Sequence, residues 1–314
     1  MRLVADVGGT NVRVALADET GSLASRVTYR GADFTSFAEV LTTYLKMVGD
    51  IKHCSACAIG AAGPVDGDRV RLTNTGWAID RTEISTKLSG MPVALVNDLE
   101  AVAAALPHLA ADDVDVLGGP APLWPAHRTM LAVNVGTGFG AASAILRGGS
   151  WWTCPSEAGH MTLGSSGTPE VDLTQVGTRI GGASIESLLS GKGVAALYKR
   201  LAQADDGSID AKIEAGDVLA RARNDAAAAR TVQLLTASFA RVAGDLALAS
   251  AAWGGVYLCG SVALGWSAVA DIDRFRVEFT QKGAMSSRMQ EVPTVIIRRK
   301  DVALFGLAKM AISH

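Results

Sequence analysis

The first stretch that could do chemistry is a glycine turn near the start of the chain, between two apolar runs of strand length. It reads Asp6-Val7-Gly8-Gly9-Thr10-Asn11. Two such runs joined by a glycine-containing turn predict a β-hairpin. Because Gly8 and Gly9 lack Cβ atoms, their N–H groups can approach an anion closely and form a cradle for phosphate. A carboxylate beside bound phosphate makes chemical sense if Mg²⁺ lies between them, so Asp6 is the candidate metal contact. The alternative is an ordinary hairpin whose aspartate caps the turn.

Two later turns repeat this theme of a strand that ends in small residues. The apolar run 130–135 leads into Gly136-Thr137-Gly138-Phe139-Gly140, and a further strand follows it. The glycine spacing does not match a dinucleotide-binding fingerprint, and a strand rather than a helix comes next. A third strand ends in Gly260-Ser261, where backbone could approach a flat base or a ribose. Gly191-Lys192-Gly193 lacks the hydroxyl and the upstream glycine of a Walker-type phosphate loop.

The candidate general base follows a different strand. The apolar run 93–96 delivers Asn97 and Asp98 to its carboxyl end, and 99–106 continues as a helix that Pro107 ends. In open α/β sheets, ligands bind where strands end and helices begin, so Asp98 is well placed for chemistry. The alternative is that Asp98 caps the helix, and both roles are compatible.

A second group of polar side chains lies further along the chain. Glu157 and His160 flank a glycine in a compact polar turn, and Glu186 stands in the first turn of a short helix capped by Ser184. Two residues of metal-binding type without a third nearby make a weak zinc site. For Glu186 the structural alternative is a favourable interaction with the helix dipole.

Composition excludes several classes of protein. The chain has 314 residues, 49% of them hydrophobic and 19% charged, as expected of a well-buried globular protein long enough for two domains. A formal net charge of −2 gives no electrostatic case for binding nucleic acid or an anionic membrane. No signal peptide is recognisable, and the apolar region 231–261 is interrupted by charges, so we expect a cytoplasmic protein without a membrane span. Cys54 and Cys57 have metal-binding spacing, but they precede a buried strand and are interpreted as core residues.

The remaining pattern predicts the elements that must position these residues. Amphipathic spacing predicts a helix from Thr35 that Gly49-Asp50 closes, and Asp80 caps the helix 81–88. Helices are also predicted over 208–230, 231–252 and 302–312. The proline-rich composition around 120–125 indicates a boundary between residues 106 and 129.

Together the motifs resemble the bacterial hexokinase-type glucokinases of the actin-like, sugar-kinase ATPase superfamily. The matching segments occur in family order over nearly the whole chain. They are Asp6–Arg13, Thr73–Trp77, Asn97–Ala101, Gly136–Gly140, Glu157–His160, Glu186–Gly191 and Gly254–Gly260.

The resemblance implies an α/β fold with two actin-like, ribonuclease-H-like domains flanking a cleft. The small N-terminal domain would be 1–106, completed by 299–314, and the large domain 107–298. It implies ATP-dependent phosphorylation of glucose to glucose 6-phosphate, with ATP and Mg²⁺ bound, Asp98 as the general base and a homodimer as the assembly. The implied sugar contacts are Asn74, Asn97, Asp98, Glu157, His160 and Glu186. The implied nucleotide contacts are Asp6, Gly8, Gly9, Thr10, Asn11, Gly136, Thr137, Gly138, Gly260 and Ser261, with Asp6 reaching Mg²⁺ through water.

The chain departs from the family pattern at two points. Ala158 replaces a glycine of the sugar loop, where a methyl group could narrow the loop or shift sugar preference. Ser261 replaces the second glycine of the third turn. Two alternatives to a glucokinase stay open at this point. One is a kinase for another hexose or an N-acetylhexosamine, and the other is a sugar-sensing regulator without catalysis.

Overall fold

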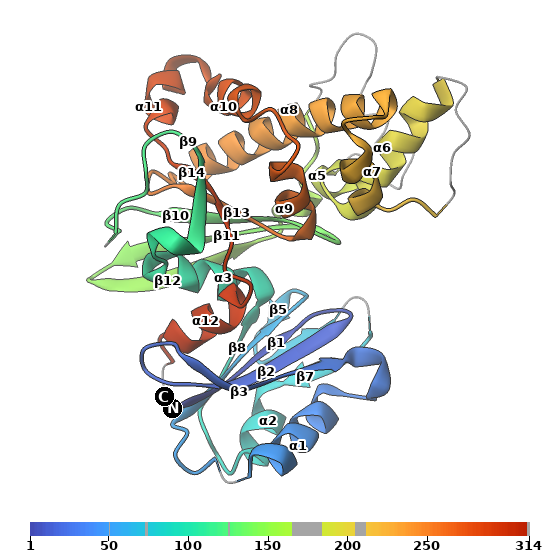
Figure 1. Cartoon of the computed structure of the whole chain (residues 1–314). Coiled ribbons are helices and arrows are strands. Elements are labelled where there is room, and N and C mark those ends of the chain that lie inside the picture. The colour runs from blue at the N-terminus through green and yellow to red at the C-terminus, as the bar shows by residue number, and fades with distance from the viewer. Residues whose placement is uncertain (50, 73–74, 125, 165–183, 205–211, 313–314) are drawn as a thin grey trace. The chain divides into compact units, whose positions relative to one another are not determined.

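The chain forms two compact units, which we call unit 1 and unit 2 (Figure 1). The computed structural model describes the chain apart from residues 50, 73–74, 125, 165–183, 205–211 and 313–314. Unit 1 comprises Met1–Leu109, Ala144–Pro155 and Arg299–His314, and unit 2 comprises Ala110–Ser143 and Ser156–Arg298. The domain boundaries implied by the family resemblance stay a prediction.

Unit 1 is built on a five-stranded sheet with the order β3-β2-β1-β4-β8. Its strands are β1 (Arg2–Val7), β2 (Asn11–Ala17), β3 (Leu23–Arg30), β4 (Ala56–Ala61) and β8 (Val93–Asn97). The first three strands are antiparallel neighbours, which confirms the predicted hairpin, whereas β4 and β8 run parallel to β1. A small antiparallel sheet stands apart, formed by β5 (Val65–Asp66), β6 (Arg69–Arg71) and β7 (Ala78–Asp80).

Helices cover both faces of this sheet (Figure 1). They are α1 (Phe37–Val48), α2 (Arg81–Lys87), α3 (Asp98–Ala105) and α12 (Val302–Lys309). Leu3 and Val7 of β1 pack in the cluster that contains α1, while Val4 between them packs with Leu304 and Leu307 of α12. A strand buried on both faces needs a continuous apolar run rather than an alternating one, and 2–7 has that pattern.

The predicted helix caps in unit 1 are confirmed. The Ser36 hydroxyl accepts a hydrogen bond from the Glu39 N–H at 3.3 Å, and Gly49 ends α1 with a φ of 77°. The Asp80 carboxylate accepts the N–H groups of Thr82 and Glu83 at the start of α2. These hydrogen bonds also lower the pKa of Asp80, after the larger effect of the hydrogen bond from Arg69.

Unit 2 contains most of a six-stranded sheet with the order β12-β11-β10-β13-β14-β9, of which the second half of β11 and nearly all of β12 belong to unit 1. The strands are β9 (Val114–Gly118), β10 (Met130–Val135), β11 (Phe139–Arg147), β12 (Ser150–Ser156), β13 (Val256–Cys259) and β14 (Thr294–Ile297). The central pairs β10–β13 and β13–β14 are parallel. β9 pairs antiparallel with β14 inside the stretch that composition marked as a boundary, so that stretch is not simply a linker.

The helices of unit 2 correct one sequence prediction. They are α5 (Ile185–Leu188), α6 (Gly191–Ala204), α7 (Ala215–Arg221), α8 (Ala226–Ala249), α9 (Ser261–Ser267), α10 (Ile272–Thr280) and α11 (Ser286–Gln290). A single helix over 208–230 is wrong for the residues that the structure describes. The helical conformation is interrupted after α7, and a new helix, α8, begins after Asp225, whose carboxylate caps it by accepting the Ala228 N–H at 2.9 Å. Residues 208–211 of that prediction lie outside the described residues.

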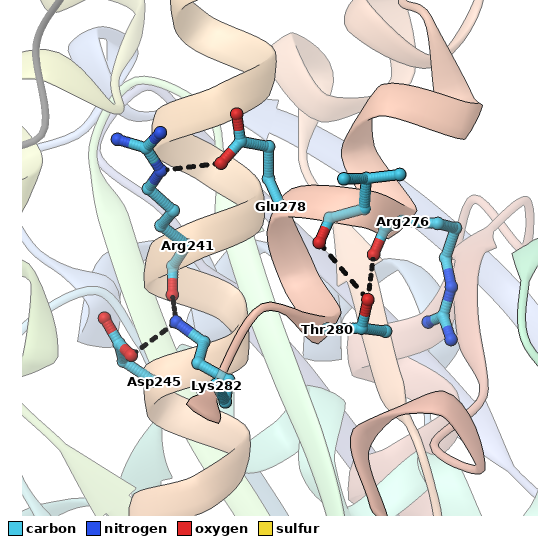
Figure 2. Close-up of polar contacts among 7 residues, drawn as sticks. Arg241, Asp245, Arg276, Glu278, Thr280 and Lys282 are labelled. Atoms are coloured by element: carbon cyan, nitrogen blue, oxygen red, sulfur yellow. Dashed lines mark hydrogen bonds and ion pairs between the residues drawn. The ribbon is translucent and has the colours of Figure 1, made fainter. Parts of the chain in front are cut away.

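Helix α8 is the central helix of unit 2 and holds α10 by polar contacts (Figure 2). Lys282 donates to Asp245 at 2.5 Å and to the Arg241 carbonyl at 3.0 Å, and Arg241 pairs with Glu278 at 2.8 Å. A Cβ on Gly244 would lie 2.7 Å from the Phe279 carbonyl oxygen, so the two chain segments meet without a side chain between them. By length and composition α8 could cross a membrane, but 72% of its most apolar window is buried within the fold, as in a core helix.

The two cysteines with metal-binding spacing are core residues, as predicted. Cys54 and Cys57 are free, buried thiols. Burial raises the pKa of Cys54 and raises that of Cys57 to about 12, so both thiols stay protonated at neutral pH. A protonated, buried thiol is a packing group rather than a metal ligand.

Candidate active site

The first predicted phosphate turn is the β1–β2 hairpin of unit 1. The Gly8 N–H donates to the Asn11 carbonyl at 3.0 Å and closes the turn, and the Thr10 carbonyl accepts the Gly31 N–H at 2.8 Å. The N–H of Gly8 is therefore used within the hairpin. The N–H groups of Gly9 and Thr10, at the tip of the turn, are the better candidates for meeting an anion.

Asp6 is tied to the facing strand. It lies opposite Arg13 in the β1–β2 register, and the Arg13 guanidinium donates to its Oδ2 at 2.8 Å. The Asp6 side chain is 14% exposed and that of Arg13 is 46% exposed. Burial raises the pKa of Asp6, and the Arg13 charge opposes that rise. The carboxylate is therefore costly to bury as an anion and gains from a nearby cation.

The residues around Asp6 fit a magnesium ion that arrives with a nucleotide. Among the residues that the structure describes, no group of three or more His, Cys, Asp or Glu side chains could hold a metal. Mg²⁺ commonly takes only one or two protein carboxylates, with waters and substrate phosphates as its other ligands. Asp6 supplies one such carboxylate beside the hairpin turn. Its Oδ2 accepts the hydrogen bond from Arg13, and its Oδ1 is the oxygen that could face a metal ion.

Asn97 and Asp98 lie where parallel strand β8 ends and α3 begins. Asn97, not Asp98, is the N-cap, so the capping interpretation of Asp98 is wrong. The Asn97 Oδ1 accepts the Leu99 N–H at 2.8 Å, and its Nδ2 donates to the Gly63 carbonyl at 3.1 Å. Glu100 completes a capping box by accepting the Asn97 N–H at 3.2 Å. The backbone that carries Asp98 is thus fixed from both sides.

Asp98 is the first residue of α3 and is half-buried. Its Oδ1 accepts the Leu99 N–H at 2.9 Å, a local bond that orients the carboxylate. The second oxygen of Glu100 accepts the Thr153 hydroxyl at 3.0 Å and so ties this helix end to β12. A carboxylate on a fixed backbone at the carboxyl end of a parallel strand is suited to accepting a proton from a bound substrate.

The second predicted turn, Gly136–Gly140 of unit 2, is hydrogen-bonded to helices α5 and α6. The Gly136 N–H donates to the Gly138 carbonyl at 2.9 Å within the turn, and the Gly136 carbonyl accepts the Gly191 N–H at the start of α6. The Glu186 Oε2 accepts the Phe139 N–H at 2.8 Å. Glu186 therefore links α5 to the turn, a role that its position in the first turn of a helix did not reveal.

The structure brings the three predicted sugar contacts of unit 2 into one neighbourhood. Glu157 precedes the 3₁₀ turn η4 (Ala158–His160) and His160 ends it; both side chains are exposed, with 3.9 Å between the His160 Nε2 and the Glu157 Oε2. A Cβ on Gly159 would lie 2.6 Å from the Phe139 carbonyl oxygen and 3.6 Å from the Cβ of Glu186. Only glycine fits there, because η4 packs directly on the residue that Glu186 binds.

The third turn joins β13 to α9 and needs glycine for two reasons. Gly260 has a φ of +99°, and a Cβ there would clash with Asn134 and with the Val135 carbonyl. This close approach places Ser261 next to the second turn, since a Cβ on Gly136 would lie 3.9 Å from the Ser261 backbone nitrogen.

Unit 2 contains a pocket of about 710 Å³ beside these two turns. Gly136, Thr137 and Ser261 line it, together with residues of α6, α7 and α9. Its volume lies within the range of small-molecule sites. Lys192 and Glu214 also line the pocket, and no role was predicted for either of them.

The structure thus groups the predicted residues within each unit. Unit 1 holds the Asp6–Asn11 turn and the Asn97–Asp98 pair, whereas unit 2 holds the polar group and the two turns beside the pocket. Asn74 lies outside the described residues. Arg13, which pairs with Asp6, was part of the matching segment but received no role of its own.

Comparison with known proteins places this arrangement in a class. A glucokinase from an Antarctic psychrotroph superposes with a TM-score of 0.84 at 29% identity, covering 98% of this chain and 97% of that one. A ROK family glucokinase from Streptomyces griseus, solved with glucose and AMPPNP, gives a TM-score of 0.67 at 21% identity, covering 98% and 99%. The fold is that of the actin-like sugar kinases. The glucokinase of Tolumonas auensis is 33% identical over 308 residues, which cover 97% of this chain and 94% of that protein. The model of the family described as Glucokinase matches residues 3–314, and the chain belongs to this family.

Proposed function

We propose that this protein transfers the γ-phosphoryl group of ATP to glucose, with Asp98 as the general base. The observation that carries the proposal is the Asn97–Asp98 pair at the end of β8, held by a complete capping box. Membership of the glucokinase family supports glucose as the acceptor. The structural relative that contains glucose and AMPPNP supports a sugar and a nucleotide as the two substrates.

The sugar contacts in this proposal are hydrogen-bonding groups without excess positive charge. A neutral polyol is recognised by directional donors and acceptors, which carboxylates, amides and an imidazole provide. Asn97 still has one N–H and acceptor capacity beyond its bonds to Leu99 and Gly63. The proposed set is Asn74, Asn97, Asp98, Glu157, His160 and Glu186.

The nucleotide contacts in this proposal are the three glycine turns. The pocket of unit 2 would take the nucleotide against Gly136, Thr137 and Ser261. The hairpin of unit 1 would contribute Asp6, Gly8, Gly9, Thr10 and Asn11. Mg²⁺, when bound near Asp6, would neutralise charge on the phosphates.

The proposed chemistry is a direct transfer. Asp98 orients the 6-hydroxyl of glucose and accepts its proton as the hydroxyl oxygen forms a bond to the γ-phosphorus. The bond between that phosphorus and the bridging oxygen breaks, and ADP leaves with the bonding electrons. Backbone N–H groups at the tips of the turns, such as those of Gly9 and Thr10, stabilise charge on the phosphate oxygens. A homodimer, implied by the family resemblance, and a cytoplasmic location, expected from the sequence composition, belong to the same proposal.

The test is a product assay with the wild-type protein. Glucose and Mg-ATP should give glucose 6-phosphate and ADP in equal amounts, and a panel of hexoses and N-acetylhexosamines compared by kcat/KM should rank glucose first. Another sugar ranked clearly above glucose would reassign the acceptor. Saturable glucose binding without any product would instead favour a sugar-sensing regulator.

A variant of the second turn tests the role of Glu186. A Cβ at Gly138 would lie 2.5 Å from the Glu186 Oε2, so Gly138→Ala should push this flexible carboxylate off the Phe139 N–H. If Glu186 also binds sugar, the KM for glucose should rise by about tenfold or more, the effect of losing one hydrogen bond to a charged group. Glu186→Gln keeps the size of the side chain and removes its charge, and it should show the same effect on KM. A KM unchanged in both variants would remove Glu186 from the sugar site.

A further inference from the structure

The pocket of unit 2 has an uneven distribution of charge and polarity. Of the described residues that line it, one is a cation, Lys192, and one is a carboxylate, Glu214. Most of the other side chains that line the pocket are small or apolar. They are Ala195, Ile213, Ala215, Leu219, Ala220, Val262, Ala268 and Val269. Apolar walls suit a flat base, and a polyphosphate would need the polar end of the pocket.

Backbone contacts fix Lys192 at the end of the pocket where the turns lie. It directly follows Gly191, whose N–H donates to the Gly136 carbonyl at 2.8 Å. Thr137 and Ser261 line the same pocket, and the backbone of Ser261 lies close to Gly136. The backbone next to Lys192 is therefore fixed to the second turn, while the Lys192 side chain itself is exposed.

Helix stability does not explain this lysine. Lys192 is the second residue of α6, where the helix dipole is positive and a further cation is unfavourable. Glu214 lines the pocket from the start of α7, and a carboxylate there would repel phosphate groups. The distribution of charge thus favours an anionic ligand group near Lys192 rather than near Glu214.

We propose that the Lys192 ammonium group binds the phosphate chain of the nucleotide and so sets which end of the pocket the phosphates occupy. This inference rests on the proposed function, because it requires that the pocket takes a nucleoside triphosphate. Lysine binds phosphate as a compact point charge with three donors, and its long side chain can follow the phosphates from the turn.

The test measures binding of ATP, ADP and adenosine by calorimetry to the wild-type protein and to Lys192→Gln, without any turnover. Dissociation constants for ATP and ADP should rise about tenfold or more in the variant, the usual effect of losing one charge-assisted hydrogen bond. Adenosine binding should stay unchanged, because adenosine carries no phosphate. The salt dependence of ATP binding should weaken, and Lys192→Arg should retain most of the affinity. Lys199→Gln, on the same helix but not lining the pocket, is the matched control.

The outcomes separate this inference from the proposed function. ATP affinity unchanged in Lys192→Gln, with an active wild-type enzyme, would overturn the role of Lys192 and leave the kinase intact. Equal weakening for adenosine and ATP would also overturn it, since Lys192 would then contact the base or the ribose, or merely support the pocket. A wild-type protein that binds no nucleotide would overturn both proposals.

Discussion

Asp98→Asn should lower kcat by about 10²–10⁴-fold, the usual contribution of a positioned general base. The amide keeps the size of the side chain and can still accept the Leu99 N–H through its oxygen, so α3 should stay intact. It cannot take the proton of the sugar hydroxyl. The KM for glucose should change much less than kcat, because the amide can still hydrogen-bond the hydroxyl in the ground state. A coupled assay for ADP, with glucose varied, measures both parameters.

The matched control for this variant is Asp112→Asn. Asp112 is an exposed carboxylate in the 3₁₀ turn Ala111–Asp113 of unit 2 and is not one of the proposed site residues. It should keep full activity. If Asp98→Asn retained the kcat of the wild type while Asp112→Asn behaved as expected, Asp98 would not be the base. If Asp98→Asn also lowered the melting temperature strongly, the loss of activity would be structural rather than catalytic.

The elements that carry Asp98 follow from local sequence patterns. An apolar run followed by polar residues and a helical pattern predicts a strand and then a helix, and β8 and α3 confirm it. The hairpin of β1 and β2 was predictable because two strand-length runs flank a short glycine turn. Local rules suffice here, since turn chemistry and capping involve residues that are close in the chain.

Some of the errors arose where the deciding contacts are distant in sequence. β9 was missed because Val114–Gly118 is a short edge strand whose partner, β14, comes almost 180 residues later. The capping interpretation of Asp98 was wrong because its neighbour Asn97 is an equally good cap, and the bond from Asn97 to Gly63 favours Asn97 in the fold. One pairing could have been found in advance, since Asp6 and Arg13 stand symmetrically about the hairpin turn and therefore face each other.

The site residues were predictable as types, but their contacts were not. Glu186 stood out as a polar residue in a short helix, yet its bond to Phe139 depends on how α5 packs against the second turn. Lys192 was considered only as part of an incomplete phosphate loop. Its place in the pocket follows from a backbone bond between Gly191 and Gly136, residues more than 50 positions apart in the sequence.

Gly306→Ala should destabilise unit 1 more than an ordinary surface substitution would. Gly306 lies in α12, which packs against α3, and a Cβ there would overlap the Ala101 carbonyl oxygen. That atom belongs to the backbone, so no side-chain rotation can relieve the overlap and one helix must move. Gly60 of β4 is also close to α3, since a Cβ there would lie 3.1 Å from the Cβ of Ala101. The helix that begins with Asp98 is thus held between small residues.

The expected loss is about 3 kcal/mol, the upper part of the range for overpacking a close-packed site. This corresponds to a fall in melting temperature of roughly 10 °C for a unit of this size. Calorimetry measures the melting temperature, and kcat should fall as well if the shift of α3 displaces Asp98.

Gly216→Ala is the stability control, because Gly216 is also helical and a Cβ there would meet nothing within 4 Å. It should leave the melting temperature unchanged or slightly higher, since alanine favours helix. If Gly306→Ala had the same melting temperature as Gly216→Ala, the close contact between α12 and α3 would not be what holds Asp98 in place.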